Sequence, residues 1–120
     1  MKYMLLIWSN PQTWESLSQD DYDWVLREHI RFQKETEVSG EHIASHALAD
    51  PSSSTTVRVR NGIMTATDGP FAEAKEHLAG YYLVECDRRE RAVELAARIP
   101  DAHITGIEVR EIVTAPEMEE

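Results

Sequence analysis

The spacing of apolar and polar residues predicts a series of strands along the chain. "KYMLLIW" (residues 2–8) is apolar at odd and even positions alike, as expected of a strand that is covered on both faces. "TTVRVRNGIMTAT" (residues 55–67) alternates instead, and Asn61-Gly62 at its centre predicts a hairpin with a type I′ turn. Further strands are predicted over residues 41–48, 78–86 and 106–113.

Residues 18–40 carry the signals of a long helix. Ser18 is the predicted N-cap, acidic residues fill the first turn, and Gly40 marks the end. The spacing predicts an inner stripe of Tyr22, Val25, Leu26, His29 and Ile30. His29 interrupts an otherwise apolar stripe.

Residues 88–99 predict a second helix. Asp87 and Glu90 have the spacing of a capping box at its start, and Pro100 helps to end it. Its predicted buried stripe consists of Ala92, Leu95, Ala96 and Ile99.

The order strand, helix, strand, hairpin, strand, helix, strand predicts the fold class. Two helices on one face of a mostly antiparallel sheet make a ferredoxin-like α+β sandwich, here with an inserted β-hairpin. Two helices leave the second sheet face bare, although the strand at 2–8 is apolar on both sides. We therefore expect a homodimer in which a second copy covers that face.

Composition narrows the class of protein. The chain has 120 residues, enough for one domain, which we assign to residues 1–114 with a short acidic tail at 115–120. Its net charge of −10 opposes binding to nucleic acid or to an anionic membrane. The longest apolar run, residues 3–8, is too short to span a bilayer. Cys86 is the single cysteine, so no internal disulfide forms and we expect a cytoplasmic protein.

The stretch "DGPFAEAKEHLAGYY" (residues 68–82) concentrates ionisable side chains. Asp68 stands before Gly-Pro, where its carboxylate either ties the turn or acts in acid–base chemistry, and both roles are compatible. Lys75 and Glu73 form either surface ion pairs or contacts to a substrate. Tyr81 and Tyr82 are predicted to point to opposite faces, one into the core and the other toward a pocket or a dimer seam.

Histidines are the remaining candidates for chemistry. His29 is either a satisfied core residue or the acid–base partner of Asp68, and His77 is equally available for proton transfer. His42 and His46 on a strand would face one way but lie far apart, so we predict no metal site. We expect no cofactor, since no glycine-rich phosphate loop is present.

One resemblance covers nearly the whole chain. "TDGPFAEAKEHLAGYYLVEC" (residues 67–86) resembles the signature of the DGPF branch of the YCII-related proteins. The flanking stretches "LADPSSSTTVRVRNG", "ELAARIPDA" and "GIEVREIV" are similar to this family as well. The resemblance implies a ferredoxin-like fold that dimerises face to face into an α+β barrel.

About activity the resemblance implies less. Most members of this branch have no assigned reaction, and their genes often lie beside those of extracytoplasmic-function sigma factors. The wider family has been proposed to hold a His/Asp acid–base centre between helix and sheet. The resemblance places its aspartate at Asp68; its helical histidine matches His29 only in part, because the spacing from Arg27 is one residue shorter.

Three hypotheses about function follow. The first is a small enzyme that carries out cofactor-free acid–base chemistry on a small organic molecule, with Asp68 and His29 or His77 as the proton-transfer groups and Lys75 steering the substrate. The second is a non-catalytic ligand-binding or regulatory dimer that acts with a sigma factor. The third, a haem-using relative of other α+β barrels, is the weakest because the sequence shows no axial-ligand context.

Overall fold

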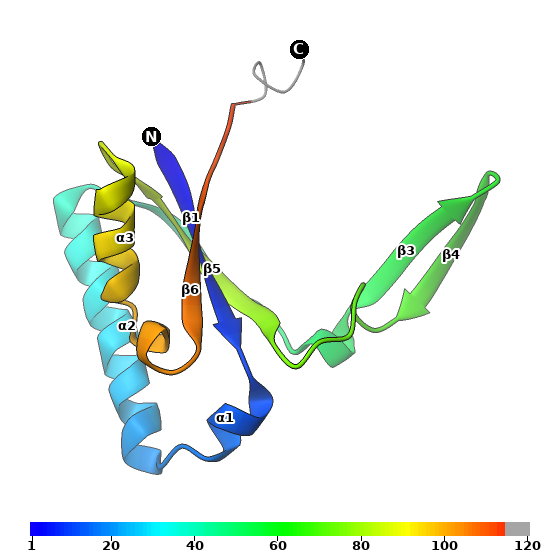
Figure 1. Ribbon diagram of the computed structural model, residues 1–120, viewed down its shortest axis with the longest axis horizontal. Coiled ribbons are helices and arrows are strands. Elements are labelled where there is room, and N and C mark those ends of the chain that lie inside the picture. The colour runs from blue at the N-terminus through cyan, green and yellow to red at the C-terminus, as the bar shows by residue number, and fades with distance from the viewer. Residues whose placement is uncertain (115–120) are drawn as a thin grey trace.

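The main body of the protein is a four-stranded antiparallel sheet with two long helices on one face (Figure 1). The structure, a computed structural model, describes residues 1–114, so the predicted tail at 115–120 lies outside the described residues. The strands are β1 (Lys2–Ser9), β2 (His42–Ala47), β5 (His77–Glu85) and β6 (Gly106–Glu111), in the order β2-β5-β1-β6. The long helices are α2 (Gln19–Ser39) and α3 (Arg89–Ala97), and the predicted α+β class is confirmed.

Both ends of α2 form as the sequence predicts. The Ser18 side chain accepts a hydrogen bond from the Asp21 amide, and the Asp21 carboxylate accepts one from the Ser18 amide, which completes a capping box. Gly40 ends the helix in the left-handed region at φ 80°. None of the helices within residues 1–114 combines the length and the hydrophobicity that crossing a membrane requires.

The predicted inner stripe of α2 is wrong at three positions, the first of which is Tyr22 with 37% exposure. Leu26 and Ile30 are 64% and 63% exposed, whereas Val25, Phe32 and Thr36 are buried. The buried positions follow the spacing of four, three and four residues that runs through His29, so the inner face is rotated toward Phe32. Leu26 and Ile30 each follow a position of this buried stripe by one residue, so they lie about 100° away from it around the helix axis.

The predicted capping box of α3 is also wrong. Arg88 is the N-cap residue, in an extended conformation at φ −153° and without a side-chain hydrogen bond to the helix. Asp87 lies one residue outside this cap, so its carboxylate does not serve the first turn. The predicted stripe is confirmed, since Ala92, Leu95, Ala96 and Ile99 are all buried.

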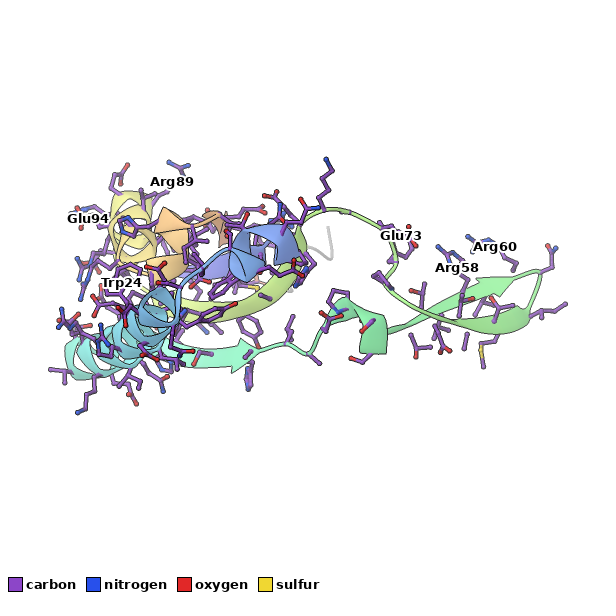
Figure 2. All side chains as sticks on the ribbon, turned by 90° about the horizontal axis from the view of Figure 1, so that it is seen from below. Trp24, Arg58, Arg60, Glu73, Arg89 and Glu94 are labelled. Atoms are coloured by element: carbon purple, nitrogen blue, oxygen red, sulfur yellow. The ribbon has the colours of Figure 1, made fainter. Side chains whose placement is uncertain are left out.

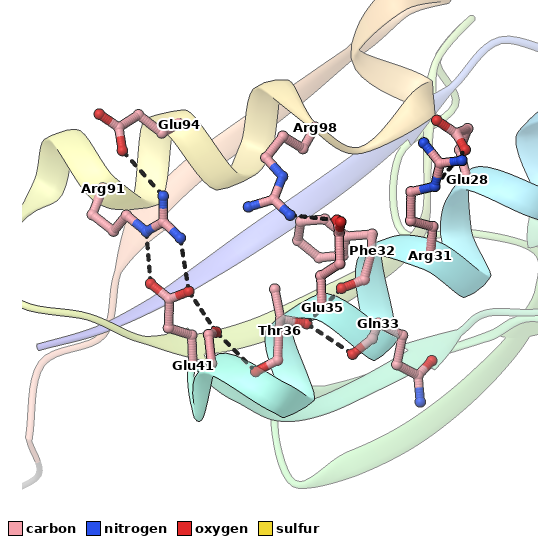
Figure 3. Close-up of polar contacts among 11 residues, drawn as sticks. Glu28, Arg31, Phe32, Gln33, Glu35, Thr36, Glu41, Arg91, Glu94 and Arg98 are labelled. Carbon is pink, nitrogen blue, oxygen red and sulfur yellow. Dashed lines mark hydrogen bonds and ion pairs between the residues drawn. The ribbon is translucent and has the colours of Figure 1, made fainter.

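The core lies between the sheet and the two helices. Its side chains come from both layers: Tyr3, Leu5, Ile7, Phe32, Tyr82, Val84, Cys86, Ala92, Leu95, Ala96 and Ile99. Ion pairs fasten α3 to the neighbouring segments (Figure 3). Arg91 makes two hydrogen bonds to the Glu41 carboxylate, of 2.7 and 3.0 Å, and Arg98 contacts Glu35 of α2 at 2.5 Å.

No helix within residues 1–114 covers the opposite face of the sheet, and we call this face the open face. Along β1 the side chains alternate, so Tyr3, Leu5 and Ile7 enter the core while Met4, Leu6 and Trp8 lie on the open face. Leu6 is nevertheless only 7% exposed, because neighbouring strands flank it on both sides. The apolar residues at odd and even positions of this strand thus serve two different faces.

The predicted hairpin forms a separate two-stranded sheet. Among the described strands, β3 (Thr55–Arg60) and β4 (Ile63–Asp68) pair only with each other, and we call residues 55–68 the arm. Asn61 at φ 53° and Gly62 at φ 75° give the predicted type I′ turn. The arm reaches away from the sheet on the side opposite the helices (Figures 1 and 2). The chain consequently measures 49 × 43 × 18 Å.

Three short helices were not predicted. Helix α1 (Pro11–Glu15) begins where the Asn10 side chain accepts a hydrogen bond from the Gln12 amide and Pro11 occupies the first turn. The other two are the 3₁₀ helices η1 (Pro51–Ser53) and η2 (Pro100–His103). Helix η2 matters most, because it carries a buried aspartate toward the core.

Candidate functional site

A hydrogen-bonded chain of three side chains connects α2, β5 and η2. His29 Nε2 lies 2.6 Å from Asp101 Oδ1, and His29 Nδ1 lies 2.7 Å from the Tyr82 hydroxyl. The His29 and Tyr82 rings are stacked, with centroids 5.8 Å apart. Each member comes from a different element, so the site exists only in the folded chain.

The packing of these elements fixes the three groups. His29 occupies the inner face of α2 between Val25 and Phe32, and Tyr82 enters the core from β5 against the edge of Phe32. Asp101 follows Pro100 in η2 and is 4% exposed, while Tyr82 is 5% exposed. The His29 side chain is 25% exposed, so it is the member that solvent reaches most.

The hydrogen bonds determine the roles of the two imidazole nitrogens. When Asp101 is ionised and His29 neutral, Nε2–H donates to the carboxylate, and Nδ1 accepts the proton of the Tyr82 hydroxyl. Burial raises the pKa of Tyr82 to about 12, with a further contribution from the negative charge of Asp101. Tyr82 is therefore protonated at neutral pH and can donate to Nδ1. The chain can hold a proton at a defined atom, which is what acid–base chemistry needs.

The carboxylate that contacts His29 is Asp101, not Asp68. Asp68 ends β4 at the base of the arm and is exposed, and within residues 1–114 its carboxylate makes no hydrogen bond or ion pair. The turn is tied instead by the Gly69 amide, which donates to the Ser54 carbonyl at 2.7 Å, and by the Thr56 hydroxyl, which donates to the Gly69 carbonyl at 2.8 Å. The interpretation of Asp68 as the residue that ties this turn is therefore corrected.

The segment between Gly69 and β5 lines a large open cavity at the base of the arm. We call it the neck cavity; its volume is about 1240 Å³. Its lining includes Trp8, residues of the loop before β3, and Phe71, Glu73, Glu76 and His77. Lys75 is exposed and does not line this cavity, so of the predicted residues only His77 and Glu73 meet there.

Asp50 is a further ionisable group of the neck cavity. Its carboxylate accepts a hydrogen bond of 2.9 Å from the Ser52 amide at the start of η1. That hydrogen bond lowers the pKa of Asp50, and the nearby His77 lowers it further. Asp50 was not among the predicted site residues, although Asp-Pro before serines is a recognisable turn signal that could have marked it.

The two tyrosines lie on opposite faces, as their alternation suggests. Tyr82 packs in the core, whereas Tyr81 lies on the open face and its hydroxyl is 2.7 Å from His46 Nδ1. His46 thus shares the open face, but His42 pairs with Val84 and contacts the Tyr82 ring on the core side. A register shift between His42 and Ala44 separates them, which corrects the expectation that both histidines face one way.

Asp101 is the principal residue that sequence reasoning missed. It stands in "IPDAH", where an aspartate after proline is typical of an exposed turn. The structure buries it because η2 folds against α2 and β1. The only available signal in the sequence was the position of His29 itself. A polar residue on an inner stripe needs a hydrogen-bonding group opposite it, so a buried partner was to be expected.

Comparison with known proteins gives two findings. Residues 1–116 match the family model described as the YCII-related domain, which spans every element of the sheet, the helices and the arm. An uncharacterised protein of Rhizobium meliloti (strain 1021) is 27% identical to the chain over 103 residues, covering 86% of this chain and 83% of that protein.

Proposed function

Because this chain belongs to the YCII-related family and its best-formed polar site is the chain Asp101–His29–Tyr82, we propose that it is a small enzyme that transfers protons on a small organic molecule. The observation that carries this proposal is the imidazole of His29, held at both nitrogens between a buried carboxylate and a buried phenol. The chain's own side chains supply the acid–base groups.

Each member has a distinct part in the proposed proton transfer. Asp101 holds the Nε2–H tautomer and stabilises the imidazolium that forms when Nδ1 accepts a proton. Nδ1 is the proton acceptor, and the Tyr82 hydroxyl gives up its hydrogen bond to this nitrogen when a substrate oxygen or carbon acid arrives. Asp101 and Tyr82 are positioning residues, and His29 is the residue that meets the substrate at its exposed edge.

We further propose that the chain belongs to the DGPF branch and that its sheet is a ferredoxin-like sandwich which forms a homodimer through the open face. The strand order β2-β5-β1-β6 and the helices on one face support the sandwich. The apolar side chains of Met4, Leu6 and Leu83 on the open face support the dimer, because no helix of the described residues covers them.

The proposed chemistry can be tested without knowing the substrate. We expect the protein to exchange hydrogen for deuterium at the carbon next to a carbonyl in at least one member of a pool of small ketones, keto acids and lactones in D₂O, followed by ¹H NMR. His29→Gln should slow this exchange by about 10²- to 10⁴-fold, because it removes the proton acceptor.

His46→Gln is the matched control. His46 also contacts a tyrosine hydroxyl at 2.7 Å, but it lies on the other face of the sheet and no carboxylate holds its second nitrogen within the described residues. Exchange should be unchanged in His46→Gln. Exchange that is equally fast in His29→Gln and the wild type would overturn the assignment.

The neck cavity favours a second candidate function, a dimer that binds a small ligand without turnover. The observation behind it is the size of the cavity and its ionisable lining of Asp50, Glu73, Glu76 and His77. In a thermal-shift screen of metabolites, a ligand of this site should lose its effect in His77→Gln and keep it in His29→Gln. The predicted association with a sigma factor stays a prediction that belongs to this second candidate.

Asp68→Asn sharpens that screen. Its carboxylate contacts no described residue, so the substitution should leave the melting temperature of the free protein unchanged. A ligand whose stabilising effect is lost in Asp68→Asn would assign the carboxylate to a binding site. A ligand that stabilises both proteins equally would leave it as a surface charge.

A further inference from the structure

The arm is an amphipathic ribbon with an uncovered apolar face. Cross-strand pairing places Val57 opposite Ala66 and Val59 opposite Met64, so these four side chains share one face. Val57, Val59 and Met64 are 60%, 59% and 63% exposed. Neither strand packs extensively on any other element of the described chain.

An isolated hairpin of this size needs a partner. Two-stranded ribbons are marginally stable in water, and a third element against their apolar face is the usual remedy. Placing the arm clear of the body also makes the chain extended, with a radius of gyration of 16.8 Å. A compact domain of 120 residues has a radius of gyration of about 13.6 Å. The exposed apolar face and the extended shape both point to a second molecule under the arm.

Charge favours a second copy of this chain as that molecule. The arm carries Arg58 and Arg60 against a single acid, whereas the whole chain has a net charge of −10. Both arginines project from one side of the ribbon (Figure 2). Arg58 lies over the Phe71 ring at 5.0 Å, Arg60 donates to the neighbouring Val59 carbonyl, and within residues 1–114 neither forms an ion pair. Both arginines lie on the face opposite Val57, Val59 and Met64, so their charge assists the approach of an acidic copy and makes no contact beneath the docked arm.

The area of the open face gives a second reason to expect that the arm docks on a second copy of the chain. Four strands about 19 Å wide and about 20 Å long cover about 380 Å², so pairing two such faces buries about 760 Å². This is the size of a crystal-packing contact, and stable interfaces bury about 1,600 Å². One face of each arm covers about 200 Å². Two docked arms and the two surfaces beneath them contribute four such areas, which raises the total buried area to about 1,560 Å².

We propose that the arm of each copy docks through Val57, Val59 and Met64 on a second copy of the chain, and that the neck cavity is closed by that copy. The cavity is lined by Trp8 of the open face and by Thr55 and Val57 at the base of the arm, so its walls include parts of both surfaces that the second copy contacts in this arrangement. The cavity is thus a two-chain site, incomplete in one copy. The docking rests on the proposed dimer but adds an exchange of arms to it.

Two neighbouring residues of β4 test the docking. Met64 and Thr65 are both exposed but point to opposite faces of the ribbon, so Met64→Lys and Thr65→Lys introduce the same charge on the docking face and on the other face. We expect sedimentation velocity at micromolar concentration to show a dimer for the wild type and for Thr65→Lys. Met64→Lys should weaken the association ten-fold or more. A monomeric wild type, or equal dimerisation of the two variants, would overturn the proposal.

Crosslinking identifies the surface under the arm. Thr65→Lys protein labelled with ¹⁵N and unlabelled Thr65→Lys protein are mixed, left to exchange and treated with a lysine-specific crosslinker. Crosslinks from the introduced lysine to Lys2, Lys34 or Lys75 should include pairs of mixed isotope, because the arm lies on the other copy. Pairs of a single isotope only would show an arm folded on its own chain and overturn the docking. A dimer without mixed pairs would retain the sheet-face dimer alone.

Discussion

At the scale of single residues, the best-defined ionic contact outside the candidate site joins Arg91 and Glu41. Two hydrogen bonds connect the guanidinium to the carboxylate, and the Glu41 side chain is only 15% exposed (Figure 3). These hydrogen bonds lower the pKa of Glu41 below its ordinary value of 4.5. Glu94 contacts the same arginine at 3.2 Å but is 53% exposed. The two glutamates therefore differ in burial and share a partner.

Glu41→Gln should lower the free energy of unfolding by about 1–2 kcal/mol at pH 7, because a charge-assisted contact is lost in a partly buried position. A carboxylate with a lowered folded-state pKa stabilises above its unfolded pKa, and the stabilisation is lost as the pH falls through the folded value. The difference between wild type and Glu41→Gln should therefore shrink below pH 4.5. Urea unfolding at several pH values measures it.

Glu94→Gln is the control for this pair, with an expected cost below about 0.5 kcal/mol because exposed ion pairs contribute little. Equal costs for the two variants, or a Glu41→Gln effect that does not decrease as the pH falls below 4.5, would contradict the argument.

The candidate site shows what a sequence reveals about single residues. The odd position of His29 on an apolar stripe was visible, because a polar group on the inner face of a helix needs a partner. Which carboxylate supplies that partner was not visible. Asp101 lies 72 positions along the chain from His29, and only the packing of η2 against α2 brings the two together. The conspicuous charged motif drew attention to Asp68, which the structure leaves on the surface.

At the scale of elements, the pairing of β2 with β5 depends on a glycine. A Cβ atom at Gly80 would lie 2.7 Å from the backbone oxygen of His46 and 3.2 Å from the Cα of Ala47. Both contacts involve backbone, which cannot rotate away, so the strands would have to separate. Gly106 in β6 is the opposite case, because a Cβ atom there meets nothing within 4 Å.

Gly80→Ala should lower the stability by about 1–3 kcal/mol, as expected when an atom is forced into a packed site. Gly106→Ala makes the same chemical change in another strand of the same sheet and should be neutral or stabilising by up to about 1 kcal/mol. Chemical denaturation of both variants tests this. A Gly80→Ala protein as stable as the wild type would mean that β2 does not approach β5 as closely as described.

The elements themselves were largely predictable because their signals are local. Alternation and the Asn61-Gly62 turn determine the hairpin, and Ser18 and Gly40 determine the ends of α2. The failures concern relations between elements. Which stripe of α2 faces inward depends on where the sheet lies, so Leu26 and Ile30 were misplaced. The position of the arm is also determined by tertiary structure. Its alternating sequence could equally have paired with the main sheet, but the arm projects away from that sheet.

At the scale of the whole molecule, the shape of the single chain is measurable. If the arm stands clear of the body, small-angle scattering of the Met64→Lys variant as a monomer should give a radius of gyration close to 16.8 Å. An arm that folds back on its own body would give a value near the about 13.6 Å of a compact chain.

The placement of Trp8 has an optical consequence. Its indole lies on the open face, donates a hydrogen bond of 3.1 Å to Glu108 and lines the neck cavity. Trp14 and Trp24 lie elsewhere, beside Tyr22 and His103. Indole fluorescence shifts to shorter wavelength when water leaves its surroundings. A protein with Trp14→Phe and Trp24→Phe would therefore report, through the emission of its single remaining tryptophan, each arrival of a second chain or a ligand at this part of the sheet.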